Sequence, residues 1–324
     1  MIEFSSQYKE NILFSVDTAV KNRLAIRVNK VESILRQLEV SLYPKHLPGE
    51  AAKLGLCPFA HGITAFSQGF IESEHANDLL SDLLTLAPEV ILRLASGEIS
   101  LVQEKSLLPS SETRGTEIYL DSTFKQVEYD ALDVSISTLC KLLGKDWAEF
   151  VSIIKFITFV KVDSWPDIPY FSGSSTDFWG AIHMSSPKSD FILAESLTHE
   201  AAHHWLNLVE EIQPLSVNPW GNPVWKSPWR SDLRPIGGVI HGVFVFSCVA
   251  VVLSNMRSMC STNQNNADLS SRLVKIISQV QAGSEVCIQS EQLTNAGNEI
   301  VTKCLDRVDA VINEDNELLF SAKI

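Results

Sequence analysis

The sequence predicts a predominantly helical α+β fold, in which a small sheet lies beside a helix that carries an H-E-x-x-H motif. Most of the chain spaces its apolar residues as amphipathic helices do. Two segments rich in β-branched and aromatic residues, 156–162 and 178–184, precede the motif and are typical of strands. The 324-residue chain has 45% hydrophobic and 20% charged residues, so it can bury a large core and does not have the composition of a disordered protein.

The chain divides into two predicted regions. Residues 1–110 form an N-terminal helical region, in which amphipathic helices are expected at 19–42 and 78–94. Residues 43–69 hold three prolines and four glycines, so they are expected to form an irregular connection between these helices. The second region, 111–324, contains the H-E-x-x-H motif and a helical C-terminal tail.

The second region is predicted to alternate short strands with long helices. In chain order we expect a β-like segment at 113–120, a helix at 130–156 that breaks near Gly144, a strand at 156–162, a turn-rich segment at 163–175, a strand at 178–184, the motif helix at 192–211, and further helices at 236–256 and 269–313. The segment 214–235 has five prolines and three tryptophans and is expected to be a long irregular loop.

Composition excludes several classes of partner. The net charge is −13, from 39 acidic and 26 basic residues, which argues against nucleic acid as the main partner because phosphate binding needs a cationic face. The most apolar run, 239–253, is interrupted by His241 and is shorter than the ~20 residues of a membrane span, so it predicts a buried helix. Residues 1–22 contain charges throughout and do not resemble a signal peptide, so a cytoplasmic location is expected.

Six cysteines are scattered along the chain without any C-x-x-C pair. Most of them lie in apolar or helix-like segments. They are therefore expected to be reduced and mostly buried thiols.

The H-E-x-x-H motif comprises His199, Glu200 and His203. Residues four apart point to the same side of a helix, so the two imidazoles can bind one divalent ion, at about 2.0–2.1 Å if the ion is zinc. His204 is turned by about 100° from His203 on an ideal helix, and either second-shell hydrogen bonding or packing is expected for it. The two histidines are the predicted metal ligands.

A third ligand decides which chemistry the motif supports. The familiar use of H-E-x-x-H is in zinc peptidases, whose glutamate is the general base toward a metal-bound water. The metzincin extension would need Gly at 206 and His at 209, but Leu206 and Val209 stand there. Glu210 and Glu211 sit too close on the same helix to fold back onto the ion. The best remaining donor is His241.

Three motifs together resemble a known family. L-x-H-E-A-A-H at 197–203, S-P-W-R-x-D-x-R-P at 227–235 and G-x-x-H-G at 238–242 are similar, in this order, to those of bacterial 2-oxoglutarate-dependent H-E-x-x-H-type peptide beta-hydroxylases. Those enzymes modify ribosomally made peptides. The resemblance covers the C-terminal two-thirds of the chain, whereas the first ~110 residues match only in being helical.

The resemblance implies an iron enzyme. His199, His203 and His241 would hold Fe(II) and leave three open positions, two of which 2-oxoglutarate would occupy. Its far carboxylate needs a cationic partner, for which Arg234 is the first choice and Arg230 the second. The implied partner is a precursor peptide, hydroxylated at a side-chain β-carbon.

Several alternatives stay open. A zinc peptidase would use Glu200 as its base, and a non-enzymatic helical protein could recognise a leader peptide and bind metal only structurally. Either arginine could instead pair with Asp232, Glu210 or Glu211 at the surface. His183 could point into the cleft or pack between strands. The tryptophans of the loop, Trp220, Trp225 and Trp229, could line a peptide groove or anchor the loop to the core.

Overall fold

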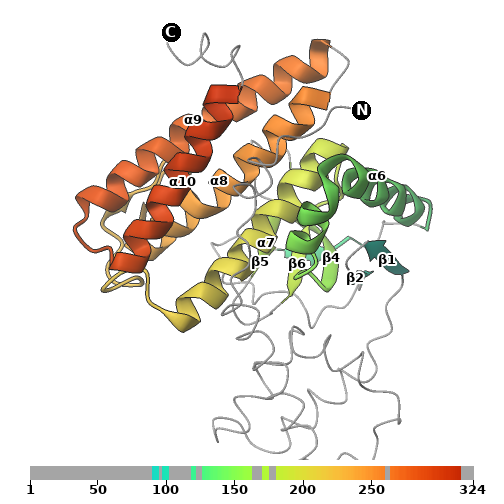
Figure 1. The fold of residues 1–324 in the computed structure, drawn as a ribbon. Helices are drawn as coiled ribbons and strands as arrows, with labels where there is room; N and C mark the ends of the chain where they lie inside the picture. The colour runs from blue at the N-terminus through green and yellow to red at the C-terminus, as the bar shows by residue number, and fades with distance from the viewer. Residues whose placement is uncertain are drawn as a thin grey trace, which may run out of the picture. The chain divides into compact units, whose positions relative to one another are not determined.

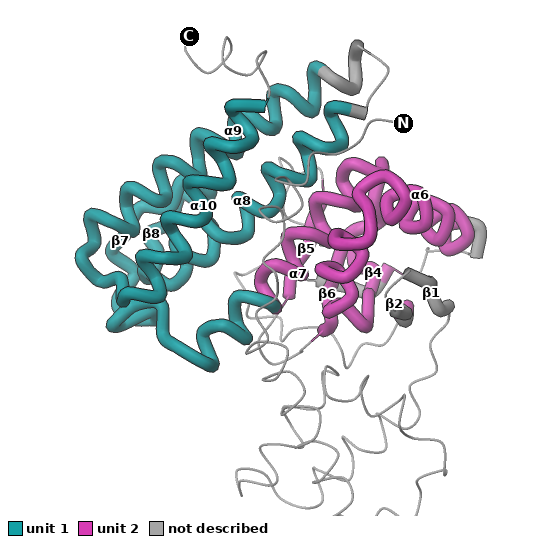
Figure 2. The backbone as a smooth tube through the Cα atoms, viewed as in Figure 1, with its two compact units in different colours: residues 1–16, 205–324 teal, residues 17–204 magenta. Residues whose placement is uncertain are grey.

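The computed structural model of the chain describes residues 90–94, 97–101, 118–121, 126–162, 170–174, 180–259 and 263–314. Outside these ranges lie the helix expected at 19–42, the connection at 43–69 and residues 78–89 of the helix expected at 78–94. The chain forms two compact units, which Figure 2 shows in two colours. We call residues 17–204 the sheet unit and residues 1–16 with 205–324 the helical unit.

The sheet unit contains a mixed sheet with strand order β1-β2-β4-β6-β5. β1 (Val90–Leu94) and β2 (Gly97–Leu101) form an antiparallel pair, β2 runs parallel to β4 (Phe156–Val162), and β4 runs parallel to β6 (Ala181–Met184). β5 (Ser172–Ser174) pairs antiparallel with β6 and ends this order, while β3 (Ile118–Leu120) pairs antiparallel with the far part of β4.

The central strands of the sheet, β4 and β6, are buried on both faces over residues 157–160 and 181–184, as is usual for parallel strands. Ile157, Phe159 and Val160 of β4 and Ile182 of β6 are at most 1% exposed. Helix α6 (Gln126–Val151) packs against β1 and is interrupted at Gly144, whose φ of 84° is open to glycine at no steric cost. This break confirms the interruption expected there.

The motif helix is α7 (Asp190–Ile212), which Figure 1 shows as one continuous helix. It begins after the Ser185–Ser186–Pro187 breaker, where the hydroxyl of Ser189 accepts a hydrogen bond from the backbone N–H of Ile192. Its buried residues include Leu197, Ala201 and Ala202. The boundary between the two units falls inside this helix, between His204 and Trp205.

The helical unit is built on three long helices that lie side by side (Figure 1): α8 (Ile236–Met259), α9 (Asn263–Gln289) and α10 (Asn295–Glu314). The stretch 236–258 of α8 is long and apolar enough to cross a membrane by length and composition, but 83% of its apolar window is buried inside the protein. The prediction of a buried helix is confirmed. The helix, Ile236–Met259, extends beyond both ends of the apolar run at 239–253.

The predicted elements around the motif are largely confirmed. The strand at 156–162 has the predicted bounds, the motif helix begins two residues earlier and ends one later, and the strand at 178–184 is present over 181–184. The β-like segment at 113–120 is confirmed over its last three residues.

Four expectations were wrong in part. Residues 90–94 form a strand and not the end of a helix, because the β-branched VILRL segment finds a partner in β2. The turn-rich segment contains the short strand β5. The long loop contains a two-residue ladder between β7 (Trp225–Lys226) and β8 (Leu233–Arg234). The helix expected over 269–313 is divided into α9 and α10, where Glu291 takes a positive φ of 56°.

The predicted boundary near residue 110 stays a prediction. Strands on both sides of it, β2 and β4, pair in one sheet.

Candidate metal centre

His199 and His203 face one another across a single turn of α7. Their ring centroids are 4.9 Å apart and the rings are inclined by 68°. Both residues are half-buried, and the side chain of His199 is 23% exposed. Two imidazoles at this separation, partly shielded from water, are suited to binding one divalent ion. Their role as metal ligands stays a prediction.

Glu200 of the same motif is buried against strand β5. It is 1% exposed, and each carboxylate oxygen accepts a hydroxyl hydrogen bond: Oε1 from Ser172 at 2.7 Å and Oε2 from Ser174 at 2.6 Å. The Nε2 atom of His199 lies 4.0 Å from Oε1. Both oxygens thus bond the motif helix to β5, the strand at one end of the described sheet.

His204 and His183 have packing positions. His204 is fully buried, and its Nε2 lies 3.3 Å from the carbonyl oxygen of Ala181, so it links α7 to β6. His183 is 1% exposed and stands opposite Gly173 in the ladder. Cross-strand partners share a face of a sheet, so His183 points to the face opposite Ser172 and Ser174, away from Glu200. Of the two options considered for His183, the structure supports packing.

His241 lies on α8 in the helical unit and pairs with a carboxylate. Its Nε2 is 3.1 Å from Oε2 of Glu210, its side chain is 8% exposed, and the ring of Trp220 lies 5.6 Å from its own. Within the ranges that the structure describes, no group of three or more His, Cys, Asp or Glu side chains is arranged to hold a metal ion. His199 and His203 belong to the other unit, so the role of His241 as third ligand stays a prediction.

The two candidate arginines share one carboxylate. Arg230 donates to both oxygens of Asp232, at 2.7 and 3.2 Å, whereas Arg234 lies 3.5 Å from Oδ2. The hydrogen bond from Arg230 is the main reason that the pKa of Asp232 falls from 3.8 to about 2. Arg230 therefore makes the closer contact with Asp232. Both arginines form the ion pair with Asp232 that was the alternative to binding a ligand.

Arg234 also lies over the first turn of α8. A Cβ added to Gly238 would come within 3.3 Å of the Arg234 Nε atom. Gly238 and His241 are three residues apart on this helix and so share a face. The structure thus places Arg234 at the same helix face as His241, within one unit.

Trp229 anchors the proline-rich loop to the helical unit. Its ring stacks on Phe246 at 5.2 Å, and Cβ atoms built on Gly242 and Gly283 would come within 2.6 Å of it. Only glycine allows the indole to approach both helices so closely. Trp220 differs, because 58% of it is exposed. Of the two roles considered for Trp229, anchoring is the one that its contacts support.

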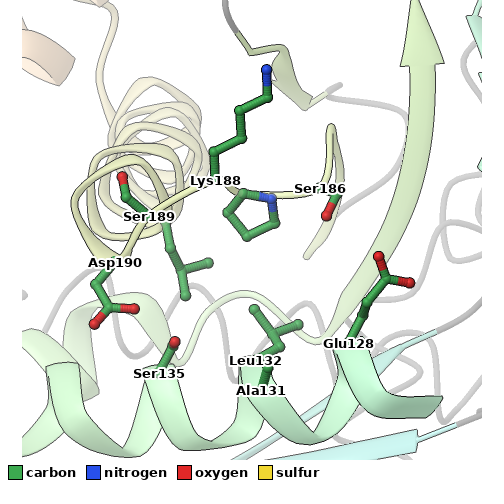
Figure 3. Close-up of a pocket in the computed structure, with 10 residues that line it drawn as sticks. Glu128, Ala131, Leu132, Ser135, Ser186, Lys188, Ser189 and Asp190 are labelled. Carbon is green, nitrogen blue, oxygen red and sulfur yellow. The ribbon is translucent and has the colours of Figure 1, made fainter. Parts of the chain in front are cut away.

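A cleft of about 320 Å³ lies elsewhere in the sheet unit, between α6 and the start of α7 (Figure 3). Its lining includes Glu128, Ser135, Lys188 and Asp190, and none of its lining residues belongs to the metal motif. Charges of both signs line it. This cleft is not the candidate metal centre.

Sequence reasoning missed Ser172 and Ser174 as partners of Glu200. The two serines alternate around Gly173, which is the spacing of one face of a strand, but the flanking turn residues hid this signal. Glu210 was considered only as a metal ligand or as a partner of the arginines. A search against known protein families and curated proteins finds no match for the chain.

Proposed function

We propose that the protein is an Fe(II)- and 2-oxoglutarate-dependent dioxygenase that hydroxylates the β-carbon of a residue in a ribosomally synthesised peptide. The observation that carries the proposal is the His199–His203 pair, with ring centroids 4.9 Å apart on one continuous helix. His241 would complete the ligand set. Bound iron would supply oxygen activation coupled to the decarboxylation of 2-oxoglutarate to succinate.

Arg234 would bind the far carboxylate of 2-oxoglutarate. It is 29% exposed, its contact with Asp232 is longer than that of Arg230, and it lies over the turn of α8 that precedes His241. A guanidinium can form two parallel hydrogen bonds to a carboxylate and so fix its orientation. These contacts favour Arg234 over Arg230 for this role.

Glu200 would hold the motif helix in position. A general base in a peptidase needs a carboxylate oxygen directed at the metal-bound water. Both oxygens of Glu200 accept hydrogen bonds from serines, which supports a positioning role and a metal centre without a glutamate base. The proximity of Glu200 to His199 nevertheless makes the zinc peptidase the alternative to be tested.

An anaerobic titration tests the proposed function. The apo protein is loaded with Fe(II), 2-oxoglutarate is added, and the visible charge-transfer absorption of a keto acid chelating ferrous iron is followed. We expect the band to appear, to need a much higher 2-oxoglutarate concentration in Arg234→Ala, and to change less in Arg230→Ala. Absence of the band, with zinc retained through purification and peptide cleavage that is lost in Glu200→Gln, would establish the peptidase instead.

A further inference from the structure

Large apolar side chains gather on the surface of one segment of the helical unit, the proline-rich loop at 214–235. Among the residues that the structure describes, seven large hydrophobic side chains are exposed, and four of them belong to this loop. Their exposed fractions range from 49% to 79%, and they are Val217, Trp220, Val224 and Leu233. Single exposed apolar residues are ordinary, whereas several in one short segment are typical of an interaction surface.

The loop exposes these side chains although the rest of the unit holds it in place. The backbone N–H of Val217 donates to the carbonyl of Gln292 at 2.9 Å. The side-chain amide of Gln279 donates to the carbonyl of Pro228 at 2.8 Å, beside the ring of Trp229 that anchors the loop to α8 and α9. A surface held in this way loses little conformational entropy when a partner binds it.

The ladder of β7 and β8 directs one face away from α8. Cross-strand partners share a face, so Lys226 stands with Leu233 and Trp225 stands with Arg234. Arg234 lies over the first turn of α8 at Gly238, so the face that it shares is turned toward the helix. The opposite face therefore carries Lys226 and Leu233, and both of these residues are exposed.

The charge of the loop is opposite to that of the whole chain. The loop has three cationic residues and one anionic residue, whereas the chain carries −13. The one anion, Asp232, pairs with both arginines, while Lys226 has no ion pair among the described residues. Apolar side chains around an exposed ammonium group complement a partner that has both apolar and acidic residues. The acidic remainder of the chain repels such a partner elsewhere.

Two other kinds of partner fit this surface less well. A second copy of the chain, docked symmetrically through the same surface, would bring Lys226 of each copy toward a like charge. An anionic membrane is attracted by clusters of lysine and arginine, but this loop offers a single cation without an ion pair among the described residues, in a chain with a charge of −13.

We propose that the exposed side chains of this loop dock a segment of the precursor peptide that combines acidic and apolar residues. We call them the loop surface: Val217, Trp220, Val224, Lys226 and Leu233. The inference rests on the proposed function only for the identity of the partner as a precursor peptide. It involves no contact between the loop surface and the candidate metal centre.

The test measures the binding of fluorescein-labelled peptides to the metal-free full chain by fluorescence anisotropy. The probe is a synthetic peptide in which glutamate and aspartate alternate with leucine and phenylalanine. Two counterparts replace either its acidic residues by lysine or its apolar residues by serine. We expect the probe to bind about tenfold more tightly than either counterpart, and to bind more weakly as the salt concentration rises.

Exposed positions allow variants that keep the fold, as circular dichroism verifies. Combining Val224→Ser with Leu233→Ser should weaken binding of the probe about tenfold, because the apolar contacts are lost. The matched control is Val134→Ser on α6, where an equally exposed valine lies in the sheet unit and the affinity should be unaltered. Lys226→Glu should weaken the probe and strengthen its lysine counterpart, whereas Lys145→Glu, also exposed on α6, should change neither.

Several results would overturn the inference. One is equal affinity for the probe and its two counterparts, and another is equal affinity of the natural protein and the double variant. A dimer that dissociates in the double variant, seen by sedimentation, would assign the surface to a second copy. Binding to phosphatidylserine and phosphatidylcholine vesicles that the double variant loses would assign it to a membrane.

The outcomes also separate this inference from the proposed function, because the probe is bound without metal. If the loop surface binds the probe but Fe(II) and 2-oxoglutarate give no charge-transfer band, the proposed function fails and the docking surface stands. If the band appears but the probe is not bound, only the docking surface fails.

Discussion

Within the H-E-x-x-H motif, residues that are adjacent in sequence have different environments. His199 and His203 are half-buried, whereas Glu200 between them is almost completely buried and bonded to two serines. On a helix, position 200 is turned by about 100° from position 199, so it faces another neighbour. The glutamate of this motif therefore stabilises the attachment of α7 to β5.

Replacement of Glu200 should affect stability according to the hydrogen bonds that remain. Glu200→Ala leaves two half-buried hydroxyls without their acceptor, and we expect the free energy of unfolding to fall by about 1–3 kcal/mol. Glu200→Gln can still bond both serines and should cost less. Chemical denaturation measures both values, with exposed Glu211→Ala as the control. An unaltered stability in Glu200→Ala would contradict the role given to these contacts.

Asp232 should titrate below the ordinary range of an aspartate. Its pKa in the folded protein is about 2, against 3.8 ordinarily, mainly because Arg230 donates a hydrogen bond to it. The ionised Asp232 carboxylate makes its full contribution to the stability of the fold above pH 3.8. This contribution is lost as the pH falls through about 2. The ¹³C shift of the Asp232 carboxyl measures the pKa, and Arg230→Ala should return it toward 3.8. A midpoint near 3.8 in the natural protein would refute the ion pair.

At the scale of elements, helix α7 is attached to three neighbours near the motif. Ser172 and Ser174 connect it to β5, His204 connects it to β6, and the indole N–H of Trp147 in α6 donates to the hydroxyl of Thr198 at 3.0 Å. Thr198 immediately precedes His199. These contacts hold the backbone from which the candidate ligands project.

Thr198→Val should therefore destabilise the protein although the two side chains are nearly the same size. The change leaves the buried N–H of Trp147 without its acceptor, which costs about 1–3 kcal/mol. The control is Thr138→Val on α6, whose hydroxyl bonds a backbone carbonyl at an exposed site and should cost below about 0.5 kcal/mol. Equal unfolding free energies for the two variants would show that the Trp147 contact contributes nothing.

Elements with a clear hydrophobic period could be predicted from the sequence, and short elements could not. The strand at 156–162 and the motif helix follow directly from the FITFVKV run and from the serines and prolines that bound the helix. β5 was missed because three residues are too few to show a period. The break between α9 and α10 carried a signal that was overlooked, since Thr294 caps α10 by accepting from the N–H of Gly297.

The candidate site was predictable only where it lies on one helix. The i, i+4 spacing alone pairs His199 with His203, because helix geometry is fixed. Contacts between elements, such as Glu210 with His241 or Arg230 with Asp232, depend on tertiary packing that one sequence does not specify. Burial of α8 was foreseen from its composition, since an apolar helix interrupted by a single histidine belongs in a core.

At the scale of the whole molecule, the helical unit gathers most of the thiols that the structure describes. Cys248, Cys287 and Cys304 are buried on α8, α9 and α10 and form no disulfide, whereas Cys140 of the sheet unit is half-buried. Burial raises the pKa of Cys248 to about 11 and that of Cys287 to about 12. The expectation of buried thiols is confirmed for Cys248, Cys287 and Cys304.

The reactivity of these thiols should report the packing of the three helices. In the native protein at pH 8 we expect iodoacetamide to modify Cys140 much faster than Cys248 or Cys287, because the attacking species is the thiolate and burial disfavours it. Modification at each position is followed by mass spectrometry. In denaturant the rates should converge. Modification of Cys248 at the native rate of Cys140 would contradict the buried environment.

The central claim is that α7 carries a metal centre through His199 and His203. The most direct test is a Co(II) titration of the natural protein and of three alanine variants, each shown to be folded by circular dichroism. We predict one tightly bound ion per chain, a large loss of affinity in His199→Ala and His203→Ala, and an unaltered affinity in His204→Ala, where the buried neighbour faces β6. If the natural protein binds no ion, or if all three variants bind it equally well, the claim is wrong.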